Sequence, residues 1–321
     1  MRHYFAFNGD ADGLCALQQL RLDTPQPDAV LVTGVKRDIC LLQRIAAVAG
    51  DRITVLDVSH DQNRDDVLRL LAAGASLHYV DHHHAGVLPQ HPRFTCCIDE
   101  APEVCTSLLV DRQLGGRHRA WAMVATFGDN LPHVGRALAQ QAGLDAASVA
   151  ILERLGIYLN YNAYGADIAD LHFDPALLAE AMLPFADPLS FAAQSPVYAR
   201  LAAAYDQDMA LARQLAPLRK LKGATLMLLP DQPWARRIIG VLANELMQDQ
   251  PDCAIGILSP DSKGGFAVSV RTPRACHAGA AEFCLGFDSG GGRQLAGGIN
   301  HLPGADLEQF LQRFEACFAI T

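Results

Sequence analysis

The first half of the chain alternates between short apolar runs and longer segments in which apolar residues recur at helical spacing. Apolar runs typical of buried strands cover residues 3–7, 29–33, 52–56 and 76–80. Helices are expected between them at residues 14–22, 38–50 and 63–73, the second with apolar residues at Leu42, Ile45, Ala46 and Ala49. Repeated strand–helix units predict a parallel sheet with right-handed crossovers.

Helical patterns follow, and strands return near the C-terminus. Two helices broken by Gly115-Gly116 are expected over 103–127, and residues 133–215 are rich in Ala and Leu, with prolines between the segments. Later strands are expected at 225–229, 253–258 and 266–271, later helices at 233–248, 276–284 and from 306, and a loop with six glycines at 286–298. We therefore expect an α/β protein with a parallel-sheet domain at 1–185, a helical connector at 186–221 and a smaller α/β domain at 222–321.

Composition narrows the class of protein. Of the 321 residues, 50% are hydrophobic and 19% are charged, which is typical of soluble globular proteins. No apolar run approaches the ~20 residues of a membrane span, and polar residues at 8–10 come too early for a signal peptide. Nine cysteines without a CxxC pair indicate reduced thiols, so we expect a cytoplasmic protein. The net charge of −9 argues against long nucleic acid and favours a small phosphorylated substrate.

Acidic residues and histidines follow three of the predicted strands. Asp10 and Asp12 follow strand 3–7, Asp57 follows strand 52–56, and Asp81-His82-His83 ends strand 76–80. The carboxyl ends of parallel strands meet at one edge of a sheet, where ligands bind. Carboxylates ~4 Å apart repel by roughly 1 kcal/mol in water and about 4 kcal/mol at an effective dielectric near 20. The arrangement therefore indicates metal ions, which neutralise that repulsion.

Each residue also has a structural interpretation. Asp10 and Asp12 could form a polar turn with an N-cap, Asp57 could end a strand, and Asp129 could end a helix. We expect Ser59-His60-Asp61 to cap the following helix. Four polar residues further along could contact a base, although helix packing is favoured slightly for them: Asn160, Tyr161, Asn162 and Tyr164.

Taken together, these motifs resemble the DHH phosphoesterase superfamily, in particular its oligonucleotide phosphodiesterases of the nano-RNase kind. The matching motifs are Asp10-x-Asp12-Gly13, Asp57, Asp81-His82-His83 and Asp129. The C-terminal part resembles the DHH-associated domain, through Ser269-Val270-Arg271, Gly290-Gly291-Gly292-Arg293 and Ala296-Gly297-Gly298. The resemblance spans nearly the whole chain.

The resemblance implies a site for two Mn²⁺ ions, with Mg²⁺ as the alternative. One ion would be held by Asp10 and Asp57, and the other by Asp12, Asp57, His82 and Asp129. Asp81 would orient a histidine, and His83 would meet the substrate phosphate. The second domain would close over the cleft and bind phosphate through Arg271, Gly291, Gly292 and Arg293.

Two positions depart from the family pattern. Many members carry a metal-binding histidine where this chain has Ala6, so the first ion would need Asn8, water or substrate to complete its shell. Many nucleotide-cleaving members carry a histidine where this chain has Arg293, which can hold a phosphate through two hydrogen bonds but is a poor proton donor.

The resemblance therefore predicts a hydrolase that cleaves a phosphodiester in short oligonucleotides or in linear or cyclic dinucleotides by a two-metal mechanism. A phosphomonoesterase on a nucleoside bisphosphate and a pyrophosphatase are the alternatives among enzymes. A processive single-strand exonuclease is disfavoured, because only 7% of residues are aromatic and the chain is acidic. A nucleotide-binding sensor that no longer cleaves is the alternative from another class, and Ala6 motivates it. Base preference, cleavage polarity and oligomeric state are left open.

Overall fold

The structure is a computed structural model, and it describes residues 1–276 and 278–320. The chain divides into two compact units. Unit 1 comprises Met1–Ala163 and Leu171–Ala203, and unit 2 comprises Tyr164–Asp170 and Ala204–Thr321. The three-part division expected from the sequence, with limits near 185 and 222, stays a prediction.

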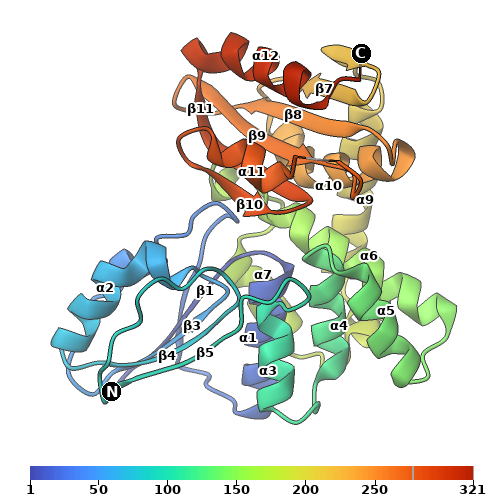
Figure 1. Ribbon diagram of the computed structural model, residues 1–321. Coiled ribbons are helices and arrows are strands. Elements are labelled where there is room, and N and C mark those ends of the chain that lie inside the picture. Colours follow the sequence, from blue (N-terminus) through green and yellow to red (C-terminus); the bar gives the residue numbers. More distant parts are fainter. Residues whose placement is uncertain (277, 321) are drawn as a thin grey trace. The chain divides into compact units, whose positions relative to one another are not determined.

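Unit 1 is built on a five-stranded parallel sheet, as predicted (Figure 1). The strands are β1 (His3–Phe7), β2 (Val30–Val32), β3 (Arg52–Leu56), β4 (Ser76–Asp81) and β5 (Phe94–Ile98). Their order is β2-β1-β3-β4-β5, so the three strands that carry the acidic motifs are neighbours. The sequence did not reveal β5, because this edge strand is only partly buried and has no continuous apolar run.

Helices cover the sheet and extend beyond it (Figure 1). They are α1 (Ala11–Asp23), α2 (His60–Ala72), α3 (Thr106–Gln113), α4 (Arg119–Gly128), α5 (Pro132–Gln141), α6 (Ala146–Ala163), α7 (Pro175–Met182), α8 (Pro188–Gln194) and α9 (Pro196–Ala212). On one face of the sheet, Val67, Leu70 and Leu71 of α2 pack with Ile53 and Leu77 of the strands. The helix break at Gly115-Gly116 and the helix-rich region 133–215 are both confirmed.

The helix predicted at 38–50 is wrong. Only Leu41–Arg44 forms a short 3₁₀ helix, and the remainder is irregular. Side chains of α2 take the backbone groups that a longer helix would use: Arg69 donates to the carbonyls of Leu42 and Ile45 at 2.9 and 3.0 Å, and Asn63 donates to that of Ile39 at 2.6 Å. Leu42 and Ile45 are buried as expected, whereas Ala46 and Ala49 are exposed, and tertiary hydrogen bonds override the helical periodicity.

The described residues of unit 2 form a six-stranded mixed sheet, the last part of α9 and the further helices given below. The strands are β6 (Arg219–Leu221), β7 (Ala224–Leu228), β8 (Ala254–Pro260), β9 (Gly265–Arg271), β10 (Gly290–Arg293) and β11 (Ala296–Pro303), in the order β10-β11-β9-β8-β7-β6. The helices are α10 (Pro233–Asp249), α11 (Ala280–Leu285) and α12 (Leu307–Phe318). The glycine loop predicted at 286–298 is wrong in part, because Gly290–Arg293 pairs with Ala296–Ile299 as an antiparallel hairpin.

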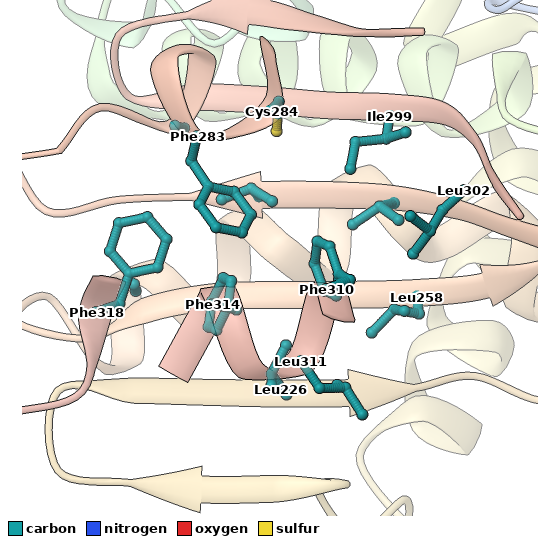
Figure 2. Close-up of a cluster of buried hydrophobic side chains, with 14 of the residues drawn as sticks. Leu226, Leu258, Phe283, Cys284, Ile299, Leu302, Phe310, Leu311, Phe314 and Phe318 are labelled. Carbon is teal, nitrogen blue, oxygen red and sulfur yellow. The ribbon is translucent and has the colours of Figure 1, made fainter. Parts of the chain in front are cut away.

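The core of unit 2 is a phenylalanine cluster between the sheet and two helices (Figure 2). Phe283 of α11 lies with its ring centroid 5.7, 5.6 and 5.1 Å from those of Phe310, Phe314 and Phe318 of α12. Such edge and tilted contacts add about 0.5–1.5 kcal/mol each beyond area burial. The cluster holds α11 against the sheet next to the β10–β11 hairpin.

Two further properties concern the cysteines and the hydropathy of the helices. All nine cysteines lie in the described residues and are free thiols, with Cys15, Cys105 and Cys284 buried and Cys96 exposed. Among the described residues, no helix combines the length and apolar character needed to cross a membrane.

Candidate metal centre

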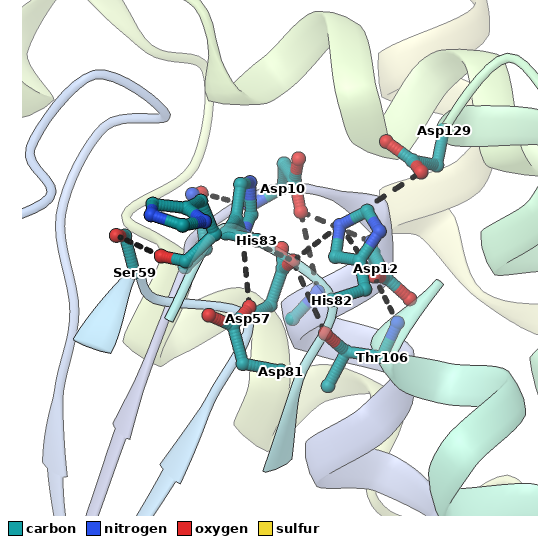
Figure 3. A network of polar contacts seen from close by, with 12 residues as sticks. Asp10, Asp12, Asp57, Ser59, Asp81, His82, His83, Thr106 and Asp129 are labelled. Atoms are coloured by element: carbon teal, nitrogen blue, oxygen red, sulfur yellow. Dashed lines mark hydrogen bonds and ion pairs between the residues drawn. The ribbon is translucent and has the colours of Figure 1, made fainter. Parts of the chain in front are cut away.

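The sheet of unit 1 brings the predicted acidic residues and histidines to one edge (Figure 3). Asp10 follows β1, Asp57 follows β3, and Asp81 ends β4. Asp10, Asp12, Asp57, Asp81 and His82 are all buried. The expected convergence of strand ends therefore occurs.

The turn from β1 into α1 is held by Asp10 and requires a glycine. Asp10 Oδ1 accepts hydrogen bonds from the backbone N–H groups of Asp12 and Gly13 at 3.0 and 3.2 Å, which makes it the N-cap of α1. A Cβ atom at Gly13 would lie 2.1 Å from the Asn8 carbonyl oxygen. The capping interpretation of Asp10 is thus correct, and its second oxygen remains for a cation.

That second oxygen is paired with Lys36, a residue that the sequence analysis did not single out. Lys36 Nζ forms an ion pair with Asp10 Oδ2 and lies 3.1 Å from Asn160 Oδ1. Burial alone would raise the pKa of Asp10, but the charge and hydrogen bond of Lys36 outweigh it and lower that pKa to about 2. Asp10 stays a predicted metal ligand.

Asp12 is fixed by the start of α3. Its Oδ2 accepts from the Thr106 N–H at 2.7 Å, and its Oδ1 accepts from the Ser107 N–H at 2.8 Å. A helix N-terminus favours negative charge, so α3 helps to keep this buried carboxylate ionised. Burial, together with the charges of Asp10 and Asp129, nevertheless raises the pKa of Asp12. Thr106 and Ser107 were missed from the sequence, although a Thr-Ser pair before an apolar run is a helix-start signal.

Asp57 lies in a backbone conformation that few residues adopt. Its φ is +58°, in the left-handed region, and such outliers cluster at functional sites. Thr106 Oγ1 donates to Asp57 Oδ1 at 3.3 Å. Burial first, and then the charges of Asp10 and Asp12, raise the pKa of Asp57 well above its ordinary value. Without a cation, burial and the neighbouring carboxylates therefore disfavour the ionised form of Asp57.

His82 is held in one orientation by the backbone. Its Nδ1 lies 2.9 Å from the Val104 carbonyl oxygen, which accepts only from a protonated nitrogen. In a neutral ring, Nε2 then has a free lone pair. This Nε2 lies 3.3 Å from Asp57 Oδ1, 3.9 Å from Asp12 Oδ2 and 4.0 Å from Asp129 Oδ2.

His83 has a different environment. Its Nδ1 lies 2.7 Å from Asp81 Oδ1, and its side chain is 45% exposed. The Asp81 carboxylate therefore orients His83 and not His82. Burial acts to raise the pKa of Asp81, but the hydrogen bond and charge of His83 lower it overall. The His83 ring is thus oriented through its Nδ1 and is partly accessible to a ligand.

The segment after His83 is anchored by residues outside the motifs. Glu100 accepts from the Ala85 N–H at 2.9 Å, and the His60 ring bonds the Ala85 carbonyl at 2.7 Å. Ser59 Oγ donates to the His84 carbonyl at 3.4 Å and makes no side-chain cap of α2. Ser59 therefore occupies the N-cap position of α2 with Asp61 in the first turn, as expected, but its hydroxyl bonds the histidine segment and not the helix.

Four residues fit a divalent cation. Asp12, His82 and Asp129 offer ligand atoms that all lie within 4.8 Å of one another, and Asp57 lies closer still to His82. Two ligands ~2.1 Å from an ion lie roughly 3–4.2 Å apart, depending on the angle between them. The distances of 3.3–4.0 Å from His82 Nε2 match that range. His83 also lies near Asp57, but its Nδ1 is already bonded to Asp81.

The polar run at the end of α6 is mainly structural, as favoured from the sequence. Tyr161 and Asn162 are fully buried, the former bonded to His172 and the latter to the backbone of His172 and Phe173. Tyr164 lies in unit 2, where its ring would contact any Cβ placed at Gly240. Asn160 differs, because it contacts Lys36 beside the metal centre.

The predicted phosphate-binding residues lie in unit 2, at one end of its sheet. Ala296 of β11 pairs with Arg271 of β9 on one side and with Arg293 of β10 on the other. Residues that pair directly across strands share a face of a sheet, so both arginines flank Ala296 on one face, about 10 Å apart.

Arg271 is firmly held. Its Nε donates to Asn244 Oδ1 at 2.7 Å, and its Nη1 donates to Ser269 Oγ at 3.1 Å. Its Nη2 makes no hydrogen bond to any residue that the structure describes. Burial lowers the pKa of Arg271.

The three glycines before Arg293 are not equivalent. A Cβ at Gly290 would lie 1.8 Å from the Cys284 carbonyl oxygen, and Gly292 has a φ of +134°. Both glycines are therefore required by the fold. At Gly291, by contrast, a Cβ would meet no described atom within 4 Å.

Comparisons with known proteins bear on the fold of the chain. No family model and no curated protein matches the chain. A solved structure of exonuclease RecJ bound to manganese matches with a TM-score of 0.61, 18% identity, 98% of this chain and 89% of that one. A pGpG-specific phosphodiesterase, PggH from Vibrio cholerae, matches with a TM-score of 0.55, 17% identity, 99% of this chain and 100% of that one. Both are DHH-superfamily phosphoesterases.

The chain has the DHH fold. The resemblance drawn from the motifs is therefore confirmed, as is the predicted α/β architecture. RecJ from Thermus thermophilus, crystallised with Mn²⁺, also matches, with a TM-score of 0.59 and 20% identity. That match covers 98% of this chain but only 51% of the Thermus RecJ. At these identities the similarity concerns the fold.

Proposed function

We propose that this DHH-fold chain is a metal-dependent phosphoesterase that hydrolyses a phosphodiester bond in short nucleotides. One observation supports this proposal above the others. His82 Nε2 faces Asp12, Asp57 and Asp129 within 4.0 Å, although these residues come from four separate parts of the chain. Buried carboxylates around an unprotonated imidazole nitrogen suit a divalent cation such as Mn²⁺ or Mg²⁺.

Different residues of the chain would hold that cation and contact the substrate. When bound, a divalent ion would activate water and offset charge on the phosphoryl oxygens. The Val104 carbonyl keeps His82 in the tautomer that binds metal, and the N-terminus of α3 holds Asp12. His83, oriented by Asp81 and partly exposed, would contact a phosphate oxygen.

A short substrate fits the chain better than a long one. The net charge of −9 leaves no overall basic footprint for a polynucleotide. PggH, which matches over its full length, is a pGpG-specific phosphodiesterase, whereas the Thermus RecJ is about twice as long as this chain. A linear dinucleotide of this kind is therefore our proposed substrate class.

Unit 2 is proposed to carry a phosphate-binding surface of its own. Arg271 and Arg293 share one face of its sheet and flank the small side chain of Ala296. Gly291 lies two residues before Arg293 and therefore points to the same face. Because no described atom would meet a Cβ at Gly291, close approach of a ligand supplies a reason for glycine there.

A substrate screen tests the proposal. Linear di- to pentanucleotides, cyclic dinucleotides, nucleoside bisphosphates and pyrophosphate are incubated with the protein and Mn²⁺, with His82→Ala as the control. Release of mononucleotides from a dinucleotide, absent in His82→Ala, is the expected result. Turnover of bisphosphates or pyrophosphate alone would make it a different phosphoesterase, and nucleotide binding without product would make it a sensor.

A further inference from the structure

A lysine holds the Asp10 end of the metal centre. Lys36 Nζ pairs with Asp10 Oδ2 and lies 3.1 Å from Asn160 Oδ1. The Lys36 side chain is 25% exposed, and that of Asp10 is 4% exposed. The positive charge is therefore held at the edge of the carboxylate cluster, where solvent screens it weakly.

The backbone places Lys36 there independently of its side chain. The Lys36 N–H donates to the Ala163 carbonyl at 2.8 Å, and the Lys36 carbonyl accepts from Asn8 Nδ2 at 3.3 Å. Asn8 Oδ1 in turn accepts from the Asp10 N–H at 3.3 Å. The side-chain amide of Asn8 therefore links Lys36 to Asp10, and both its nitrogen and its oxygen are already hydrogen-bonded.

The same contacts leave few ligand atoms for a metal ion between Asp10 and Asp57. Asp10 Oδ1 accepts two backbone N–H groups, and Oδ2 is paired with the ammonium. Ala6 is fully buried and has no ligand atom. An ion at this place would also lie next to the Lys36 ammonium and be repelled by it.

We propose that the Lys36 ammonium replaces one of the two metal ions, so that a single divalent ion works beside a fixed positive charge. The inference rests on the proposed function, because it concerns the same metal centre. The single ion is the one held by Asp12, Asp57, His82 and Asp129, and Lys36 neutralises Asp10. The lysine thereby explains how the chain tolerates an alanine at position 6.

Counting bound metal tests this proposal without any substrate. Mn²⁺ is titrated into the metal-free protein, with calorimetry for affinity and electron paramagnetic resonance for the unbound ion. Wild type and Lys36→Arg should bind one Mn²⁺ per chain. Lys36→Ala should bind two, because it frees Asp10 Oδ2 and removes the repelling charge. Asp10→Asn should keep its single ion, since Asp10 is not a ligand in this arrangement.

The outcomes separate this inference from the proposed function. Two ions in wild type, or loss of an ion in Asp10→Asn, would overturn the role of Lys36 and leave a metal-dependent enzyme. No bound ion in wild type would overturn both. One ion in a folded Lys36→Ala protein would show that the lysine does not exclude the second ion. Circular dichroism checks folding, and Lys263→Ala, at an exposed turn of unit 2, serves as the matched lysine control.

Discussion

His83 Nδ1 lies 2.7 Å from Asp81 Oδ1, and this contact sets the orientation of a partly exposed imidazole. Asp81 is fully buried, and within the described residues its other carboxylate oxygen has no hydrogen-bond partner. The Asp81 carboxylate therefore acts mainly on the His83 ring. With Nδ1 protonated, Nε2 accepts in the neutral ring and donates only when it also carries a proton, as the proposed hydrogen bond to a phosphate oxygen requires.

Replacing Asp81 by Asn should impair turnover more than metal binding. The neutral amide no longer stabilises a protonated Nδ1, so His83 loses its preferred tautomer and orientation. We expect a loss of about 10- to 100-fold in kcat/KM on the best dinucleotide, typical of residues that orient a functional histidine. Mn²⁺ affinity, measured by calorimetry, should stay close to wild type. An equal loss of metal binding would place Asp81 or His83 among the metal ligands.

Replacing Asp57 by Asn should abolish activity without destabilising the metal-free protein. Asn tolerates the left-handed backbone at this position, and it removes a buried negative charge that faces Asp10 and Asp12. In chelator, the urea midpoint of Asp57→Asn should equal or exceed that of wild type. Asp57→Ala should be less stable than Asp57→Asn by roughly 1–2 kcal/mol, because alanine is strained at positive φ. A large loss in Asp57→Asn would mean that the charge is stabilised within the protein.

The strand-end acids could be predicted because two local signals coincide in them. β1, β3 and β4 are each rich in apolar residues, and an acid stands at or just after the end of each: Asp10 shortly after β1, Asp57 directly after β3 and Asp81 as the last residue of β4. In a parallel sheet this order alone implies that Asp10, Asp57 and Asp81 meet at one edge. No knowledge of long-range packing was needed for that step.

Residues that reach the site through packing could not be predicted in the same way. Lys36 lies in an irregular segment, and its contact with Asn160 joins positions 124 residues apart. Thr106 and Ser107 carry a helix-start signal, but the carboxylate that caps their helix comes from Asp12, far away in sequence. The failed helix at 38–50 has the same cause, because Asn63 and Arg69 of α2 bind its carbonyls.

The ion pair of Asp170 with Arg236 should make the stability of unit 2 depend on pH. Asp170 accepts from Arg236 Nη2 at 2.8 Å and from Nε at 2.7 Å, and these hydrogen bonds lower its pKa from 3.8. Asp170→Asn should therefore cost about 1.5–3 kcal/mol in urea unfolding at neutral pH. A carboxylate with a depressed pKa stabilises the fold above its unfolded value and loses that effect as pH falls through the folded value.

The difference between wild type and Asp170→Asn should accordingly be the same at about pH 7 and pH 5 and shrink below about pH 4. Arg136 pairs with Glu153 on the surface, so Glu153→Gln provides an exposed ion-pair control with an effect below about 1 kcal/mol. A difference that persists unchanged at low pH would mean that packing, and not charge, holds Asp170.

Removing Arg293 should weaken catalysis and leave metal binding unchanged. A charge-assisted hydrogen bond to phosphate contributes roughly 1.5–3 kcal/mol, which corresponds to about 10- to 150-fold in kcat/KM. Arg293→Ala is compared with wild type on the best substrate, with Mn²⁺ binding measured in parallel. An effect below about twofold would remove Arg293 from the substrate site.

Gly291→Ala separates a binding role of the glycine strand from a structural one. The added Cβ meets no described atom within 4 Å, so the urea midpoint should match wild type. It would, however, project on the face shared by Arg293 and Ala296, where the phosphate is proposed to approach the backbone. We therefore expect KM for the dinucleotide to rise at least about tenfold, the effect of losing one charge-assisted contact.

Gly290→Ala is the matched control, because its Cβ would lie 1.8 Å from the Cys284 carbonyl oxygen and should destabilise the protein itself. Unchanged kinetics in a stable Gly291→Ala protein would show that no ligand needs this face of β10.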